Sequence, residues 1–228
     1  MFKEFAMVLL IIIIHELGHL MASKFYGWNF DKIAIYPFGG CCKFDERINR
    51  SLKEEFIILI MGPLFQIGLF IVIYLFHLIG IITYRNFVIF TTYHYTLLLF
   101  NLLPIYPLDG GRILNIGMNY LLPYKKGNKV VIFLSSIVIL GIMFFYKNLN
   151  FTLMGILLLT ELFLYLKRQD YLYNRMLLER YMNKYNFKKE KIVNNKDSMY
   201  KEKRHVLFFR NKYITEKDYL KERFKVIK

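Results

Sequence analysis

Residues 5–23 read FAMVLLIIIIHELGHLMAS and place two histidines and a glutamate inside a long aliphatic run. A membrane core is about 30 Å thick and requires roughly 20 apolar helical residues, a length that this run approaches. His15 falls about ten residues into the run, so at about 1.5 Å per residue it lies near the middle of the bilayer. No small-residue cleavage site follows the run, and we interpret it as a retained transmembrane span and not as a signal peptide.

The histidines and the glutamate form the pattern HExxH at residues 15–19. On a helix, a spacing of four residues places His15 and His19 on one face, within reach of a single metal ion, with Glu16 beside it as a general base for water. Ionisable groups in the membrane interior are costly, and no lysine or arginine lies nearby, so a cation or a wet cavity has to compensate them. The structural alternative is a pair of histidines satisfied by hydrogen bonds in a helix bundle.

The rest of the chain has the composition of a membrane protein with charged ends. Its 228 residues are 56% hydrophobic and 18% aromatic, yet they carry a formal net charge of +15. Four further segments approach the length of a span, at about residues 56–82, 87–118, 130–146 and 151–166. We therefore expect an all-α polytopic membrane protein with about five transmembrane helices. Residues 1–168 are expected to form the transmembrane domain, and residues 169–228 a short basic tail in the cytosol.

The basic residues predict how the spans are oriented, because cytosolic loops carry an excess of lysine and arginine. Six lie in residues 24–55 and three in residues 125–129, whereas the other side of the membrane holds only three. Five spans then place the amino terminus outside and the tail in the cytosol. From residue 167 onward the chain has 19 basic and 8 acidic residues, a net charge of +11, which suits contact with anionic lipid. Basic tails are common in membrane proteins, and we expect no nucleic-acid partner.

Three short stretches depart from a uniform apolar helix. Residues 61–63, MGP, and Gly68 further along predict a close helix approach and a kink in the second span, which is a packing role. Residues 101–112, NLLPIYPLDGGR, carry prolines and paired glycines, so we expect a helix broken at about residues 104–111 that lines a cavity in the protein. Residues 32–44, KIAIYPFGGCCKF, predict a hairpin that dips into the membrane, with an ordinary interfacial loop as the alternative.

A catalytic zinc site usually has three protein ligands and one open position, so the two histidines require a third ligand. Asp109 is the candidate, because it is the only acidic residue between Glu55 and Glu161 and lies in the broken stretch. His77 and His94 are rivals within the expected membrane domain. Each of them lies in an uninterrupted helical run, where packing or a polar contact explains it.

The chemistry expected of this set is metal-assisted hydrolysis of a peptide bond. With the scissile carbonyl and a water molecule polarised by the metal, Glu16 takes the water proton and delivers it to the leaving amine. Asn101 can donate a hydrogen bond to a substrate carbonyl or make an interhelical contact, and its chemistry fits both. Two other classes of protein are alternatives: a catalytically silent membrane scaffold, and a metal transporter with ligands spread along a conduction path.

These motifs together resemble the site-2 protease family (M50) of intramembrane zinc metalloproteases, and within it the subfamily that acts in sporulation. The resemblance rests on HELGH, on PFGG at residues 37–40, on MGP and on NLLPIYPLDGGR, and it covers roughly residues 5–185. It implies one zinc ion per chain, bound by His15, His19 and Asp109, with Glu16 catalytic. It also implies a substrate groove and a membrane-reentrant β-hairpin near the active site, with substrate contacts from Asn101, Pro107, Phe38, Gly39 and Gly40.

The resemblance further implies partners and a location in the bacterial cell membrane. The expected substrate is a membrane-associated protein, in this subfamily the pro-form of a sporulation sigma factor, and inhibitory membrane proteins are expected to hold the enzyme in check. A homo-oligomer is compatible with these features. The tail of about sixty residues is shorter than the subfamily's nucleotide-sensing domain of the cystathionine-β-synthase type, so we expect a truncated regulatory region.

Overall fold

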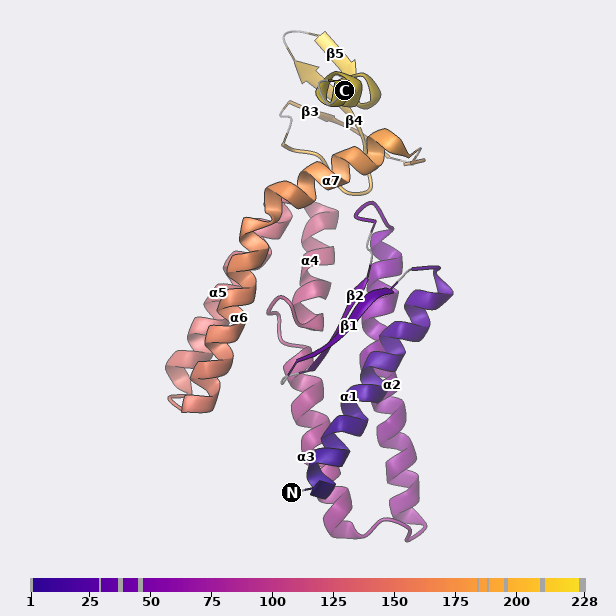
Figure 1. The fold of residues 1–228 in the computed structure, drawn as a ribbon, viewed down its shortest axis with the longest axis vertical. Coiled ribbons are helices and arrows are strands. Elements are labelled where there is room, and N and C mark those ends of the chain that lie inside the picture. The colour runs from indigo at the N-terminus through magenta and orange to yellow at the C-terminus, as the bar shows by residue number, and fades with distance from the viewer. Residues whose placement is uncertain are drawn as a thin grey trace. The chain divides into compact units, whose positions relative to one another are not determined.

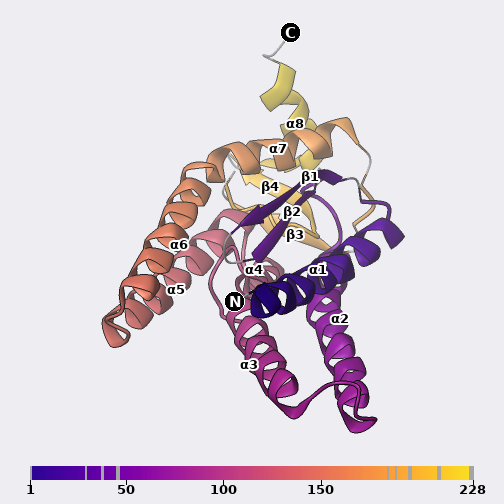
Figure 2. The same cartoon turned by 60° about the horizontal axis from the view of Figure 1, so that its bottom comes forward.

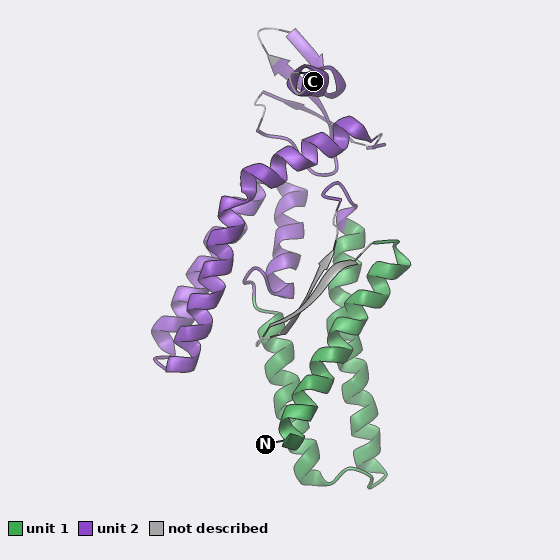
Figure 3. Ribbon diagram, viewed as in Figure 1, with its two compact units in different colours: residues 1–46, 53–103 green, residues 47–52, 104–228 purple. Residues whose placement is uncertain are grey.

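The computed structural model divides the chain into two compact units (Figure 1 and Figure 3). Unit 1 comprises residues 1–46 and 53–103, and unit 2 comprises residues 47–52 and 104–228. The structure describes residues 2–28, 30–36, 39–44, 47–183, 185–187, 189–194, 197–209 and 212–225, with the backbone alone for residues 30–44 and 209.

Unit 1 is a helical bundle that carries one β-hairpin. Its elements are, in chain order, α1 (Phe2–Phe25), β1 (Phe30–Tyr36), β2 (Gly39–Phe44), α2 (Leu52–Leu78) and α3 (Tyr84–Asn101), with the first residue of α2 assigned to unit 2. β1 and β2 pair antiparallel, with Ile33 opposite Cys42, and β2 lies against α1. The predicted hairpin is therefore confirmed. Its entry into the membrane stays a prediction, and Phe38 lies outside the described residues.

Glycines allow α1 and α2 to approach each other closely. A Cβ atom on Gly18 would lie 2.3 Å from the carbonyl oxygen of Met61, and a Cβ atom on Gly62 would lie 2.3 Å from the ring of His19. Both distances are far below van der Waals contact, so a larger residue at either position would push the helices apart. The close approach predicted at Gly62 is thus confirmed, whereas the one predicted at Gly68 is not, because nothing lies within 4 Å of a Cβ atom there.

Four helices among the described residues are long and apolar enough to cross a membrane, namely α1, α2, α5 (Tyr124–Phe145) and α6 (Leu149–Lys167). The third expected span is divided into α3 and α4 (Asp109–Leu121) by the non-helical residues 102–108, which confirms the predicted break. α3 falls short of the composition of a span because Arg85, Asn86 and several Thr and Tyr replace aliphatic residues in it. The expected class, a polytopic helical protein with about five membrane segments, agrees with these four candidates and the divided third segment.

Unit 2 combines α4, α5 and α6 with a small α/β module. α5 and α6 run side by side in both views (Figure 1 and Figure 2). The C-terminal module, residues 169–225, follows and contains α7 (Gln169–Met182), β3 (Glu190–Val193), β4 (Arg204–Phe209), β5 (Lys212–Thr215) and α8 (Glu216–Phe224). β4 is central and pairs parallel with β3 and antiparallel with β5. Composition predicted only a basic tail here, whereas the module has its own apolar core.

A polar network joins the C-terminal module to the short segment that precedes α2. The Arg180 guanidinium donates to the side-chain oxygen of Asn49 at 2.6 Å. The Glu179 carboxylate accepts from the backbone N–H of Asn49, and the Glu202 carboxylate accepts from the backbone N–H of Leu52 at 2.7 Å. These bonds explain why this segment belongs to unit 2 although it is distant from the module in sequence.

His205 and Glu216 lie buried in the same network. Glu216 accepts from the His205 ring at 3.0 Å and from Arg180 at 2.9 Å, while His205 Nε2 accepts from the backbone N–H of Tyr200. Burial lowers the pKa of His205, although its hydrogen bond with Glu216 opposes the change. Burial by itself raises the pKa of Glu216, but the His205 hydrogen bond and the Arg180 charge together bring that pKa below its ordinary value.

We predict that acid destabilises the C-terminal module in two steps. Because folding lowers the pKa of His205, its contribution to stability is complete above about pH 6.5 and is lost as the pH falls below that value, by at most about 1.4 kcal/mol per pH unit. The lowered pKa of Glu216 adds a second loss below about pH 4.5. The rate of proteolysis within the module, measured between about pH 7 and pH 5 on wild type and His205→Gln, isolates the first step. A wild-type rate that does not change over this range would contradict the prediction.

Candidate metal centre

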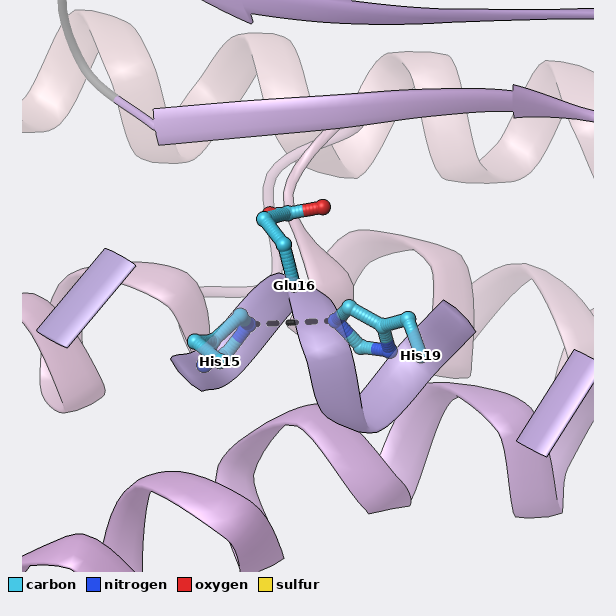
Figure 4. Close-up of side chains that lie close together, drawn as sticks. All are labelled: His15, Glu16 and His19. Atoms are coloured by element: carbon cyan, nitrogen blue, oxygen red, sulfur yellow. Dashed lines mark hydrogen bonds between the residues drawn. The ribbon is translucent and has the colours of Figure 1, made fainter. Parts of the chain in front are cut away.

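The HExxH residues come together on α1 in unit 1 (Figure 4). The ligand atoms of His15, Glu16 and His19 lie within 4.8 Å of one another, and no other cluster of three such residues occurs in the described part of the chain. Both imidazoles are buried, and their Nε2 atoms are 3.1 Å apart. Glu16 is partly exposed, and its side chain leaves α1 on the side of the β-hairpin (Figure 4).

Hydrogen bonds behind the two rings determine which nitrogen of each histidine carries the proton. His19 Nδ1 lies 2.9 Å from the backbone oxygen of Ile58, and His15 Nδ1 lies 2.9 Å from Gln66 Oε1. Both oxygens can only accept, so each Nδ1 carries a proton and each Nε2 presents a lone pair. The two Nε2 atoms joined by a dashed line in Figure 4 therefore face each other as acceptors.

This arrangement fits a metal ion. Two facing lone pairs inside an apolar helix repel each other unless a cation or a proton lies between them. Their separation of 3.1 Å is close to the roughly 3.3 Å between two nitrogens that are each about 2.05 Å from a tetrahedral zinc ion. Hydrogen bonds to Ile58 and Gln66 account for the Nδ1 atoms, and the two Nε2 atoms converge on one point at a spacing that suits a shared metal ion.

Gly62 of α2 leaves room for the two rings. A Cβ atom at this position would lie 2.3 Å from His19 Nε2 and 2.9 Å from His15 Nε2. Sequence reasoning gave Gly62 only a packing role and did not single out Gln66 or Ile58. Gly62 and Gln66 are four residues apart on α2, so they share one helix face, and this spacing is the signal that could have identified Gln66. A backbone acceptor such as Ile58 leaves no signal in a sequence.

The other predicted site residues lie on several elements. Asp109 is buried at the first residue of α4 in unit 2, whereas the histidines belong to unit 1. Asn101 ends α3, Pro107 lies in the loop before α4, and Gly39 and Gly40 begin β2. Their roles, as third zinc ligand for Asp109 and as substrate contacts for the others, stay predictions.

Unit 2 holds the loop before Asp109 in a defined conformation. A Cβ atom on Gly111 would lie 2.2 Å from the backbone of this loop, so glycine is needed for α4 to begin here. The backbone N–H of Tyr106 donates to Ser135 Oγ on α5 at 3.0 Å, and the Tyr106 ring stacks on Tyr165 of α6 with centroids 4.1 Å apart. These contacts place Asp109 at the N-terminus of α4.

The two rival histidines do not join the cluster of described metal-binding side chains. His77 Nδ1 lies 2.9 Å from the backbone oxygen of Ile82, and its ring stacks on Phe87. His94 is buried, and its ring stacks on Phe70. Packing and a local hydrogen bond therefore explain His77, whereas His94 is held by ring packing and its Nδ1 has no hydrogen-bond partner among the described residues.

Comparison with known proteins identifies the family. Residues 4–83, which contain α1, the hairpin and α2, match the model of peptidase family M50. Stage IV sporulation protein FB of Bacillus subtilis (strain 168) is 34% identical over 187 residues, which are 80% of this chain and 65% of that protein. The chain belongs to peptidase family M50. The family resemblance predicted from HELGH and NLLPIYPLDGGR is confirmed.

Two further similar proteins come from Methanocaldococcus jannaschii. A zinc metalloprotease is 32% identical over 166 residues, which are 71% of the M50 chain and 47% of that relative. The solved structure of a site-2 protease matches with a TM-score of 0.54 and 26% identity, over 74% of this chain and 76% of the other. The expected class, a polytopic helical membrane protein, agrees with this likeness. The M50 chain spans 65% and 47% of the lengths of the two curated relatives.

We predict that Gly62→Ala weakens zinc binding and that Gly68→Ala on the same helix does not. The new methyl group of the first variant meets both Nε2 atoms, whereas nothing lies within 4 Å of a Cβ atom on Gly68. Mutating a residue that only hydrogen-bonds to a metal ligand typically lowers metal affinity by roughly 10- to 100-fold. Displacing a ligand itself should lower zinc affinity by at least as much. Competition with a chelator gives the zinc dissociation constant of each variant, and equal constants would contradict the role of Gly62.

Proposed function

We propose that this M50 protein is an intramembrane zinc metalloprotease, which hydrolyses a peptide bond in or next to a membrane-associated segment of a substrate protein. The observation that carries the proposal is the pair of buried Nε2 lone pairs 3.1 Å apart, with Glu16 beside them on the same helix. The M50 match and the likeness to a zinc metalloprotease and a site-2 protease support it. A silent scaffold would not need this arrangement, and a transporter would spread its ligands along a path.

The proposed ligands of one zinc ion per chain are His15, His19 and Asp109. Two imidazoles and one carboxylate leave the open position that a catalytic zinc site requires, and this donor set favours zinc among divalent ions. A carboxylate is seldom buried unless a cation or several hydrogen bonds compensate its charge, so the burial of Asp109 suits a metal ligand.

The proposed mechanism is hydrolysis with Glu16 as the general base. When bound, zinc supplies Lewis acidity to the scissile carbonyl and to water. The Glu16 carboxylate lies within 4.8 Å of the ligand nitrogens and is partly exposed, so it can take a proton from water and then deliver it to the leaving amine. Because a helix hides its carbonyls in its own hydrogen bonds, the substrate has to be extended at the cut. We propose that it contacts Asn101, Pro107, Phe38, Gly39 and Gly40.

The proposed substrate is the membrane-associated pro-form of a sporulation sigma factor. The identity of 34% to a stage IV sporulation protein supports this choice. The distribution of lysine and arginine supports a cytosolic C-terminal module, and the Bacillus subtilis relative supports a location in the bacterial cell membrane. Inhibitory membrane proteins are proposed as regulators, and a homo-oligomer as an assembly state. No nucleic-acid partner is proposed.

We predict that Glu16→Gln keeps zinc and loses cleavage, whereas His19→Ala loses both. Removing the general base lowers the rate by about 100- to 10,000-fold without removing a ligand. Metal analysis of the purified proteins gives the zinc content, and co-expression with the pro-sigma factor gives the cleavage. Folded wild-type protein without zinc would overturn the proposed function in favour of a silent scaffold.

We predict that Asp109→Asn weakens zinc binding and that Glu161→Gln does not. Both residues are acidic and lie within expected membrane segments, but only Asp109 is proposed to hold the metal. Loss of a ligand should lower zinc affinity by more than the roughly 10- to 100-fold that follows from the loss of an outer-shell hydrogen-bond partner. Zinc dissociation constants distinguish the variants, and a wild-type constant for Asp109→Asn would show that the third ligand is another residue.

A further inference from the structure

Gln66 links the three helices of unit 1 behind the metal centre. Its side chain is fully buried on α2. Its Nε2 donates to the backbone oxygen of His94 on α3 at 2.9 Å, and its Oε1 lies 2.9 Å from His15 Nδ1 on α1. Gln66 therefore spans the distance between a fixed backbone group and a histidine of the HExxH motif.

The partner on α3 leaves the Gln66 amide only one orientation. A backbone oxygen can only accept, so the amide NH₂ has to face His94 and the amide oxygen has to face His15. His15 Nδ1 must then be the donor, which leaves His15 Nε2 as a lone pair towards His19. Because Gln66 is inaccessible to solvent, no water competes for either bond.

We propose that Gln66 is a positioning residue of the metal centre, which selects the metal-binding tautomer of His15 and holds its ring. The proposal rests on the zinc site of the proposed function. His19 is held by the backbone oxygen of Ile58, which no substitution removes. His15 is therefore the ligand whose state depends on a side chain, and Gln66 is the residue to change.

Loss of the Gln66 amide would open a competing state. Without an acceptor behind it, the His15 ring is free to move its proton from Nδ1 to Nε2. His15 Nε2 lies 3.1 Å from His19 Nε2, so the new N–H would donate directly to His19. The two ligands would then satisfy each other, and zinc would have to break this bond before binding.

The test compares zinc dissociation constants of the full chain, measured by chelator competition. Gln66→Met has a similar shape without an acceptor, and we expect it to bind zinc about 10- to 100-fold more weakly. Gln66→Glu keeps an acceptor behind His15 and should bind zinc more tightly than Gln66→Met. The matched control is Gln169→Met, which removes another buried amide with two hydrogen bonds, from unit 2, and should leave the constant within about twofold.

A second readout, the tautomer of His15, uses the metal-free protein. Nitrogen-15 spectra of labelled histidines should show the proton on Nδ1 in the wild type and on Nε2 in a large share of Gln66→Met. Wild-type zinc affinity and an unchanged tautomer in Gln66→Met would overturn the role of Gln66. If the wild type binds no zinc, the proposed function fails, and the tautomer still decides the role of Gln66.

Discussion

Two imidazole nitrogens that face each other inside an apolar helix are the constraint on which unit 1 depends. Polar groups in such a place need partners on every side, because lipid and aliphatic side chains offer none. Accordingly α2 contributes an acceptor behind each ring, from Ile58 and Gln66, and α3 contributes the carbonyl that orients Gln66. Gly62 carries no side chain that would collide with the rings. The packing of three helices thus follows from the hydrogen-bonding needs of two side chains.

The two units meet their polar requirements in different ways. Unit 1 directs the Nε2 atoms of its two buried histidines towards one point, with a backbone and an amide acceptor behind the rings. Unit 2 closes its polar groups on one another, since the charge of Arg180 is matched by Glu216 and by backbone oxygens in the C-terminal module. A convergent arrangement suits the binding of an ion, and a closed one suits stability. This contrast favours a catalytic role for unit 1 and a structural one for the Arg180 network.

Local patterns carried most of what the sequence could predict. The HExxH spacing, the prolines of the broken segment and the hairpin around PFGG are each contained within a few residues, so their meaning does not depend on distant contacts. Gln66 was missed because an isolated amide in an apolar run reveals nothing until its partners on two other helices are known. The division of the third segment into α3 and α4 was predictable because its prolines and paired glycines lie within eight residues of one another. The sheet of the C-terminal module was not predicted, because its strands are short and the segments between them are rich in charged residues.

The hydrogen bond from Leu52 to Glu202 also bears on how the chain is made. The two residues are separated by 150 positions, and at about 5–20 residues per second the ribosome needs roughly 8 to 30 s to pass from one to the other. During that interval the first turn of α2 exists without its carboxylate partner, while the apolar segments that follow it are already entering the membrane. Folding order therefore runs against chain order at this point, because an early helix forms this hydrogen bond with a segment that is synthesised much later.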